Sequence, residues 1–105
     1  MQLSRTEAVR AALAATNGVS GQNNSLVSSG AISLASGSTA TAYHGIMVKA
    51  LTANTDSVWI GIGSATTGTG TELNPGEGVT INIDSLTKVY GISTSGTQSV
   101  SYILT

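Results

Sequence analysis

Apolar and polar residues alternate along four short stretches of the second half of the chain. Valine, isoleucine, tyrosine or leucine occupies every second position within residues 58–62, 79–83, 88–93 and 99–104. A period of two residues is typical of a β-strand that turns one face to a core and the other outward. The sequence therefore predicts four strands here, and we expect them to form the core of the protein.

The middle of the chain predicts one short strand, over residues 31–35, and one longer strand, over residues 41–52. One face of the longer strand holds His44, Ile46, Val48 and Ala50, and the other holds Tyr43, Gly45, Met47, Lys49 and Leu51. Apolar groups on both faces are typical of a strand that is covered on both sides. We therefore expect the face with Tyr43, Met47 and Leu51 to contact a partner.

Groups of turn-forming residues separate these stretches. Proline fixes φ for the second residue of a turn and glycine accepts the positive φ of the third position of type II, so Pro75-Gly76 predicts a chain reversal. Residues 54–57 and 94–97 are expected to close hairpins, and residues 64–70 to form an exposed loop. Turns recur about every 8–12 residues, which is typical of an all-β sandwich or small barrel. The predicted fold is all-β, a small antiparallel β-sandwich that is jelly-roll-like or a flattened barrel.

The N-terminal part predicts a short helix. Ser4 and Glu7 have the spacing of a capping box, and strong helix formers follow them. The apolar stripe of this helix contains Val9 and Leu13. A helix of about three turns is unstable alone in water, so we expect it to dock on its own domain or on a neighbour.

Residues 19–30 are rich in Ser, Asn and Gly and contain few apolar anchors. Such composition predicts either an extended connector arm or a plain flexible linker. The expected organisation is therefore an N-terminal helix and arm over residues 1–30, followed by a β-sandwich domain over residues 31–105.

Charged residues are rare in this chain. They make up 9% of it, against about 25% in ordinary globular proteins. Four basic and five acidic residues give a net charge of −1, and a charge near zero promotes association. We therefore expect the protein to act within an assembly. The basic residues are scattered and do not follow a row of phosphates, so nucleic acid is not an expected partner.

Several classes of protein are disfavoured by what the sequence lacks. The chain has no cysteine, so neither a disulfide framework nor a thiolate metal site is expected. Its apolar runs are all shorter than the ~20 residues of a membrane span, and its N-terminus lacks the apolar region of a signal peptide. We expect no membrane association.

Candidate catalytic or metal-binding residues are few. His44 is the one histidine, and a triad or zinc site needs companions, so a structural or interface role is favoured. Glu72, Glu77 and Asp84 are candidate oxygen ligands for Ca²⁺, but their spacing favours solvated carboxylates in turns. The sequence predicts no catalytic residue, no cofactor and no metal site.

Aromatic residues offer one binding alternative. Trp59 lies on the strand face opposite to its valine and isoleucine neighbours, and together with Tyr43 or Tyr90 it is a candidate platform for stacking a sugar ring. Burial of Trp59 in a core or in a protein interface is favoured over this role, because large aromatic residues dominate both.

The second half of the chain also has a recognisable order of parts. The turn Leu73-Asn74-Pro75-Gly76-Glu77 precedes the strand Lys88-Val89-Tyr90, and a closing strand ends at Leu104. In this order, residues 52–105 resemble small virion proteins of tailed bacteriophages. The resemblance implies a β-sandwich component of the head or tail that has no enzymatic activity and no catalytic residues.

Together, resemblance and low charge lead to a functional hypothesis. The protein is expected to be a capsid decoration (cement) protein that binds the major capsid protein. It is expected on the virion surface, with assembly in the host cytoplasm. We also expect it to associate with itself as a homotrimer. The expected interface residues are Val9, Leu13, Tyr43, Met47, Leu51 and Trp59. The alternative is a carbohydrate-binding or fibre- or tail-associated β-module.

Overall fold

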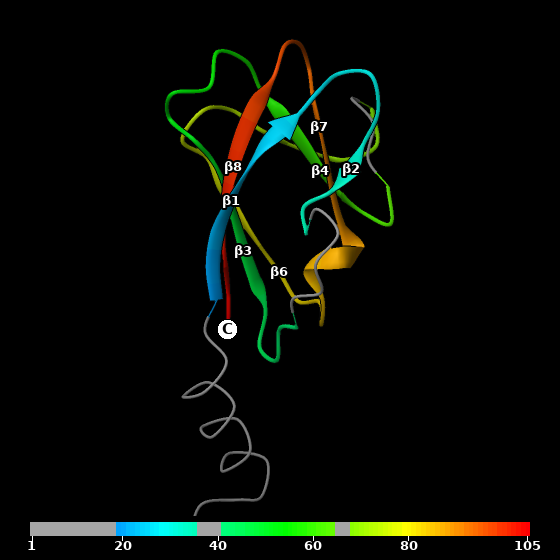
Figure 1. Ribbon diagram of the computed structural model, residues 1–105, viewed down its shortest axis with the longest axis vertical. Coiled ribbons are helices and arrows are strands. Elements are labelled where there is room, and N and C mark those ends of the chain that lie inside the picture. Colours follow the sequence, from blue (N-terminus) through cyan, green and yellow to red (C-terminus); the bar gives the residue numbers. More distant parts are fainter. Residues whose placement is uncertain (1–18, 36–40, 65–67) are drawn as a thin grey trace, which may run out of the picture.

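The structure is a computed structural model that describes residues 19–35, 41–64 and 68–105. The described residues contain eight strands and one turn of 3₁₀ helix (Figure 1). The strands are β1 (Val19–Leu26), β2 (Ile32–Ser33), β3 (Ile46–Ala50), β4 (Val58–Ile62), β5 (Thr71–Leu73), β6 (Gly78–Ile81), β7 (Val89–Ser93) and β8 (Gln98–Leu104), and the 3₁₀ helix η1 covers Leu86–Lys88.

The strands form two antiparallel sheets of four strands each. Sheet A has the order β1-β8-β3-β6, and sheet B has the order β2-β7-β4-β5. The pairs are nested, because β1 pairs with β8, β2 with β7, β3 with β6 and β4 with β5. Apart from the β4–β5 hairpin, each connection passes from one sheet to the other. Eight antiparallel strands wound in this way form a jelly roll, so the predicted β-sandwich is confirmed.

The core lies between the two sheets. Every second side chain of a strand points into it, as the two-residue period of the sequence predicts. In β3, Ile46, Val48 and Ala50 are fully buried, whereas Met47 and Lys49 are exposed. The predicted alternation in β4, β6 and β8 is likewise observed. The core is nevertheless larger than the four predicted strands, because it also contains side chains that come from β1 and β3 and from the segment after β2.

Two predicted hairpins are wrong, since residues 54–57 and 94–97 connect strands of different sheets. The reason is visible in their hydrogen bonds. The Asn54 side chain donates to the Ser99 carbonyl at 2.8 Å and accepts from the Ser99 N–H at 2.9 Å. The Gln98 side chain accepts from the Thr55 N–H at 3.0 Å. These side-chain contacts bind the 54–57 crossover to the start of β8, which directly follows the 94–97 crossover.

The Pro75-Gly76 turn has the predicted backbone conformation. Gly76 has φ +89°, and the Glu77 N–H donates to the Asn74 carbonyl at 2.9 Å, as a type II turn requires. The turn does not join two strands of one sheet, however. It carries the chain from β5 in sheet B to β6 in sheet A.

The largest correction concerns residues 19–30, because most of this predicted connector arm is strand β1. Leu26 is fully buried, and its side chain crosses the core to lie against Gly91 of β7 in sheet B. Asn23 is also buried, and its amide donates to the Leu34 carbonyl at 3.2 Å. The sandwich therefore includes Val19–Leu26, and its expected start at residue 31 is wrong.

Two strand boundaries also differ from the sequence prediction. The long strand expected over residues 41–52 is shortened to β3, because the amides of Tyr43 and His44 both donate to the Thr105 carbonyl, at 2.9 and 2.7 Å, rather than to a neighbouring strand. Lys88 ends η1 and does not begin β7. The predicted N-terminal helix lies outside the described residues.

The close approach of Leu26 to Gly91 gives a stability test. A methyl group at Gly91 would lie 2.9 Å from Leu26 Cδ1 and 3.2 Å from Leu34 Cδ2, and both leucines are buried. Gly91→Ala should therefore lower the free energy of unfolding by about 1–3 kcal/mol, measured by urea denaturation. Gly30→Ala is the control, since nothing lies within 4 Å of the added methyl group.

Leu26→Val removes both Cδ atoms, so the double variant should lose less stability than the sum of the two single changes. Equal stability of Gly91→Ala and Gly30→Ala, or strictly additive effects of Gly91→Ala and Leu26→Val, would contradict the packing of β1 across the core.

Candidate functional site

The outer face of sheet A carries two apolar side chains on its two central strands, near the ends of those strands. Met47 of β3 lies directly opposite Ile103 of β8, and each is 43% exposed. Ser20 of β1 and Thr80 of β6 complete the row across the sheet. An exposed Met–Ile pair between hydroxyl side chains is a small apolar patch on an otherwise polar face, and we call these four residues the sheet A row.

The structure separates the other predicted interface residues from Met47. Tyr43 is 47% exposed and lies before β3, whereas Leu51 follows β3 and is half-buried. Trp59 is on sheet B, where its indole N–H donates to Thr94 Oγ1 at 3.0 Å. Val9 and Leu13 lie outside the described residues. The six predicted residues thus do not form one surface within the described part of the chain.

Trp59 belongs to the outer face of sheet B. It lies opposite Ile92 of β7, and Gly61, two residues further along β4, lies opposite Tyr90. Residues two apart on a strand share a face, so Trp59 and Tyr90 are diagonal neighbours beside a position without a side chain. Of the two tyrosines proposed to join Trp59 in a platform, the structure brings only Tyr90 to its face.

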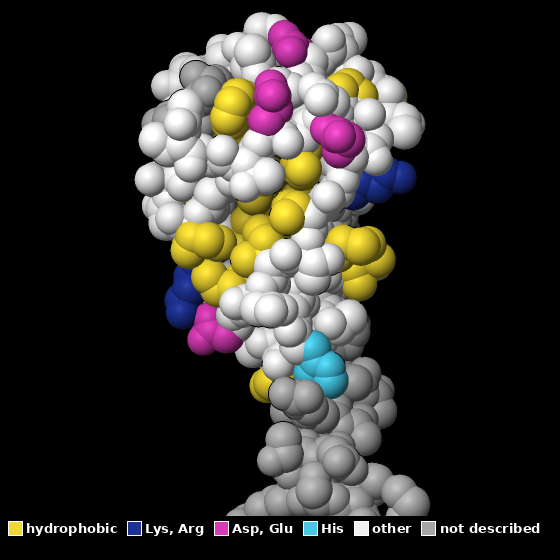
Figure 2. Space-filling model, turned by 180° about the vertical axis from the view of Figure 1, so that it is seen from behind, with side chains coloured by type: hydrophobic (Ala, Val, Ile, Leu, Met, Phe, Trp, Pro, Cys, Tyr) yellow, Lys and Arg dark blue, Asp and Glu magenta, His cyan; other side chains and the backbone are white. Residues whose placement is uncertain are grey.

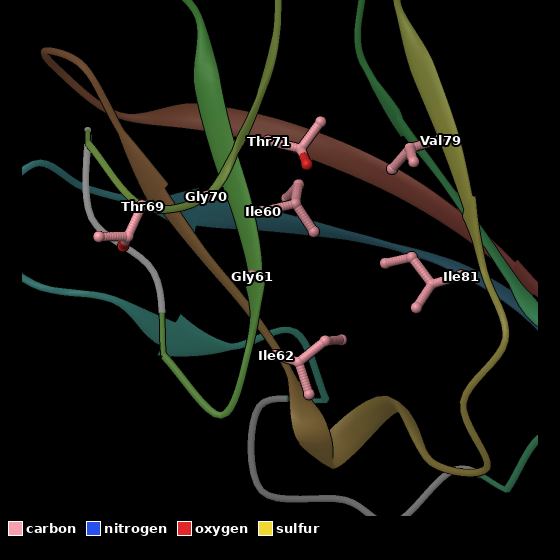
Figure 3. A pocket seen from close by; sticks show the side chains of 8 residues that line it. All are labelled: Ile60, Gly61, Ile62, Thr69, Gly70, Thr71, Val79 and Ile81. Carbon is pink, nitrogen blue, oxygen red and sulfur yellow. The ribbon is translucent and has the colours of Figure 1, made fainter.

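An apolar cleft opens between the two sheets on their β5 and β6 side. It has a volume of about 200 Å³ and is lined by Ile60, Gly61, Ile62, Thr69, Gly70, Thr71, Val79 and Ile81. Figure 3 shows the side chains of Ile62 and Ile81 pointing toward one another across it. Hydrophobic side chains also gather in the middle of the molecular face shown in Figure 2. The lining has no titratable side chain, so it is suited to receive apolar groups.

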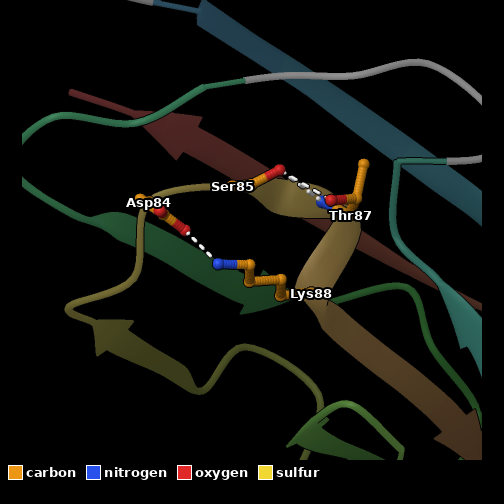
Figure 4. A network of polar contacts seen from close by, with 4 residues as sticks. All are labelled: Asp84, Ser85, Thr87 and Lys88. Atoms are coloured by element: carbon orange, nitrogen blue, oxygen red, sulfur yellow. Dashed lines mark hydrogen bonds and ion pairs between the residues drawn. The ribbon is translucent and has the colours of Figure 1, made fainter.

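A second, more open hollow of about 260 Å³ is polar. It is lined by Ala42, Tyr43, His44, Asn82, Ile83 and Asp84. His44 is exposed here and is not on the buried face of β3, where the sequence placed it. Asp84 accepts a hydrogen bond from the Lys88 ammonium at 2.8 Å, beside the Ser85 cap of η1, whose hydroxyl accepts from the Thr87 N–H at 3.2 Å (Figure 4).

The candidate Ca²⁺ ligands are each engaged in separate contacts. Glu72 Oε2 accepts from the Ser57 hydroxyl at 2.8 Å, and Glu77 Oε1 accepts from the Asn74 N–H at 2.7 Å. Asp84 is paired with Lys88. Among the described residues, no three His, Cys, Asp or Glu side chains are grouped closely enough to hold a metal ion.

Two carboxyl groups have altered acidity. The Lys88 hydrogen bond and charge hold the pKa of the Asp84 carboxyl below its usual value. The Ser95 hydroxyl donates to Asp56 Oδ2 at 2.6 Å, and the Ser57 N–H donates to Oδ1 at 2.8 Å. These bonds lower the pKa of Asp56.

Comparisons of the chain with known protein families, curated proteins and solved structures give no match. In the described part of the chain, no helix has the length and apolar character needed to cross a membrane. The functional assignment of the candidate sites therefore rests on the geometry of the described residues.

Sequence reasoning missed the cleft and half of the apolar pair on sheet A. The alternation over residues 99–104 predicts that Tyr102 and Leu104 share the buried face, and it does not single out Ile103 between them. The sequence does not indicate the cleft, because its isoleucines have the alternation of ordinary core residues. The feature that opens it is the short length of the edge strands β5 and β6, which cover the core incompletely.

The lowered pKa values predict a loss of stability in acid. A carboxyl group with a lowered pKa in the folded state contributes stability above its ordinary pKa, near 4, and this contribution disappears as the pH falls through the lowered pKa. The free energy of unfolding should therefore fall as the pH is lowered from above the ordinary carboxyl pKa, near 4, through the lowered pKa values of Asp56 and Asp84.

Lys88→Ala should raise the pKa of Asp84 toward its ordinary value, which carboxyl ¹³C NMR can follow. Asp56 is the internal control, because its hydrogen bonds come from Ser95 and Ser57. An unchanged Asp84 titration in Lys88→Ala would contradict the assignment of the shift to this pair.

Proposed function

We propose that the protein is a non-enzymatic structural component of a bacteriophage virion, a decoration protein that binds the major capsid protein and associates with itself on the capsid surface. The observation that carries this proposal is the exposed Met47–Ile103 pair on the two central strands of sheet A. Contiguous apolar patches with a polar rim mark protein interaction sites, and methionine is enriched at protein interfaces.

Two further properties support the proposal. Jelly rolls are frequent in viral capsid proteins, although they also occur in lectins and enzymes, so the fold alone assigns no function. The low charge is more informative. With 9% charged residues, the protein has little Coulomb attraction to offer a partner, so its contacts must depend on apolar side chains and on hydroxyl or backbone hydrogen bonds.

Binding to phage heads stripped of their decoration protein tests this function. Met47→Asp should lower the affinity by more than about tenfold, because burying an unpaired carboxylate costs well over the ~1.4 kcal/mol of a tenfold change. Binding of the parent protein should persist as salt rises from about 0.05 to 0.5 M, since there are few charges to screen. Co-sedimentation of protein with heads measures both.

Tyr43→Asp is the matched control, because it introduces the same charge at a similarly exposed side chain away from the sheet A row. Lys88→Ala is the control for loss of a charge. Both variants should bind as the parent does. Release of the parent by salt, with Met47→Asp still bound, would reject the apolar contact on sheet A.

A carbohydrate-binding module is the second candidate, and the shared face of Trp59 and Tyr90 is the observation that favours it. The missing side chain at Gly61 leaves room beside both rings. Aromatic rings bind apolar surfaces well and keep a polar edge available for hydrogen bonds, as a sugar requires.

A glycan titration followed by tryptophan fluorescence tests this alternative directly, because the chain has a single tryptophan. If the protein is a decoration protein, the Trp59 emission should not change on titration with a panel of host-surface glycans. A saturable change that is lost in Tyr90→Ala and kept in Tyr43→Ala would favour the carbohydrate-binding module instead.

A further inference from the structure

Strand β6 is an open edge of sheet A. It pairs with β3 on one side, and the described residues place no strand on its other side. Edges of this kind are normally protected by charge, by proline, by a bulge or by very short length. Residues Gly78–Ile81 contain no charged residue and no proline, and their register with β3 is regular.

The other three edges carry such protection. Edge strand β1 has a register irregularity between Asn23 and Leu26. Strand β2 is only two residues long, and β5 has three residues and contains Glu72. Strand β6 is therefore the edge most open to pairing with another strand.

The backbone of β6 presents hydrogen-bonding groups to this open side. The Glu77 carbonyl accepts from the Ala50 N–H at 2.9 Å, so it faces β3. Backbone groups of successive residues in an antiparallel strand point to alternate sides. Val79 and Ile81 consequently direct their N–H and C=O groups toward β3, whereas Thr80 directs its own toward the open edge.

The apolar cleft lies beside this same edge. Val79 and Ile81 of β6 line it together with Ile62 of β4. Ile62 shares the inward face of β4 with Val58 and Ile60, and yet it is 54% exposed. An inward-pointing side chain with this exposure shows that the described strands do not close the sandwich on the β6 side.

Electrostatics favours a second copy of the chain as the occupant. Identical surfaces meet without repulsion only where they are uncharged or self-complementary. Neither β6 nor the cleft lining contains a charged residue, and the net charge of the whole chain is −1. The surface is thus self-complementary in charge, in backbone hydrogen bonding and in apolar character.

We propose that β6 pairs antiparallel with β6 of a second copy across a two-fold axis, with Thr80 opposite Thr80 of that copy. This register places Val79 opposite Ile81 of the second copy and forms a reciprocal pair of hydrogen bonds between the two Thr80 backbones. Sheet A becomes continuous across both chains, and the two clefts face one another and close. The inference rests on the self-association proposed above, and it gives a two-fold dimer in place of the homotrimer of the functional hypothesis.

Sedimentation equilibrium of the full chain, with and without Thr80→Lys, tests the pairing. The parent should have the mass of a dimer. Thr80→Lys should raise the dimer dissociation constant about tenfold or more, because like charges directly opposite one another in paired strands are destabilising and juxtaposed like charges in an interface cost more than a tenfold change in affinity. Ser20→Lys, on β1 at the opposite edge of the same sheet, is the matched control and should leave the dimer intact.

Thr80→Pro is a second variant that adds no charge. It removes the N–H on the open edge and leaves the bonds to β3, so it should give a folded monomer by circular dichroism. Since the chain lacks cysteine, Thr80→Cys should also cross-link to a dimer on oxidation, whereas Ser20→Cys should not.

A parent that is monomeric, a trimer unaffected by Thr80→Lys, or a dimer dissociated by Ser20→Lys instead would each overturn the pairing. Head binding is measured separately from mass. A parent that dimerises through Thr80 without binding phage heads keeps the pairing and rejects the virion function. A monomeric parent that binds heads keeps the proposed binding to the capsid and rejects the pairing.

Discussion

The pairing of β1 with β8 is the contact on which the sandwich depends, because it joins the first and last described strands into one sheet. Val19 lies opposite Leu104 and Asn23 opposite Val100, so the described chain closes on itself like a long hairpin whose tip is the β4–β5 turn. This long hairpin is folded into the two sheets, and the side chains on the faces that the sheets turn toward each other form the core. Leu26 holds the two layers together by packing from sheet A against Gly91 of sheet B.

This winding also determines where the molecule is closed and where it is open. Sheet A ends at β1 on one side and at β6 on the other. On the β6 side, the half-buried Val79 and Ile81 line a cleft, and none of the described strands covers them. The outer face of sheet A, with Met47 and Ile103, adjoins this edge at Thr80, which lies opposite Met47. The proposed function uses the outer face for the capsid, and the further inference uses the β6 edge for a second copy.

Much of the fold could be predicted from the sequence, since alternating residues in β4, β6 and β8 give both the strand and its buried face. Strand β1 could not, because two of its inward positions are not apolar. Gly21 leaves room for the Tyr102 ring, and the buried Asn23 has its amide satisfied by the Leu34 carbonyl and by the Ser25 N–H. Neither residue produces a hydrophobic period, so the strand looked like a polar connector.

The partners of the strands and the candidate site were harder to predict than the strands. Turn residues show that the chain bends, but not which sheet it enters next. Asn54 favours a turn in any case, and its bonds to Ser99 are between residues distant in sequence. Similarly, Met47 was found from its place on a two-faced strand, whereas Ile62 was assigned to the core because its exposure depends on how far β5 and β6 extend.

Residue-resolved hydrogen exchange of the intact protein tests the winding most directly. If β1 is part of the closed sheet, its amides that pair with β8 should exchange only through the same cooperative opening as those of β8, with a matching free energy of opening. Rapid exchange throughout Val19–Leu26 while Gln98–Leu104 remains protected would contradict this account and would show a sandwich that holds together without its first strand.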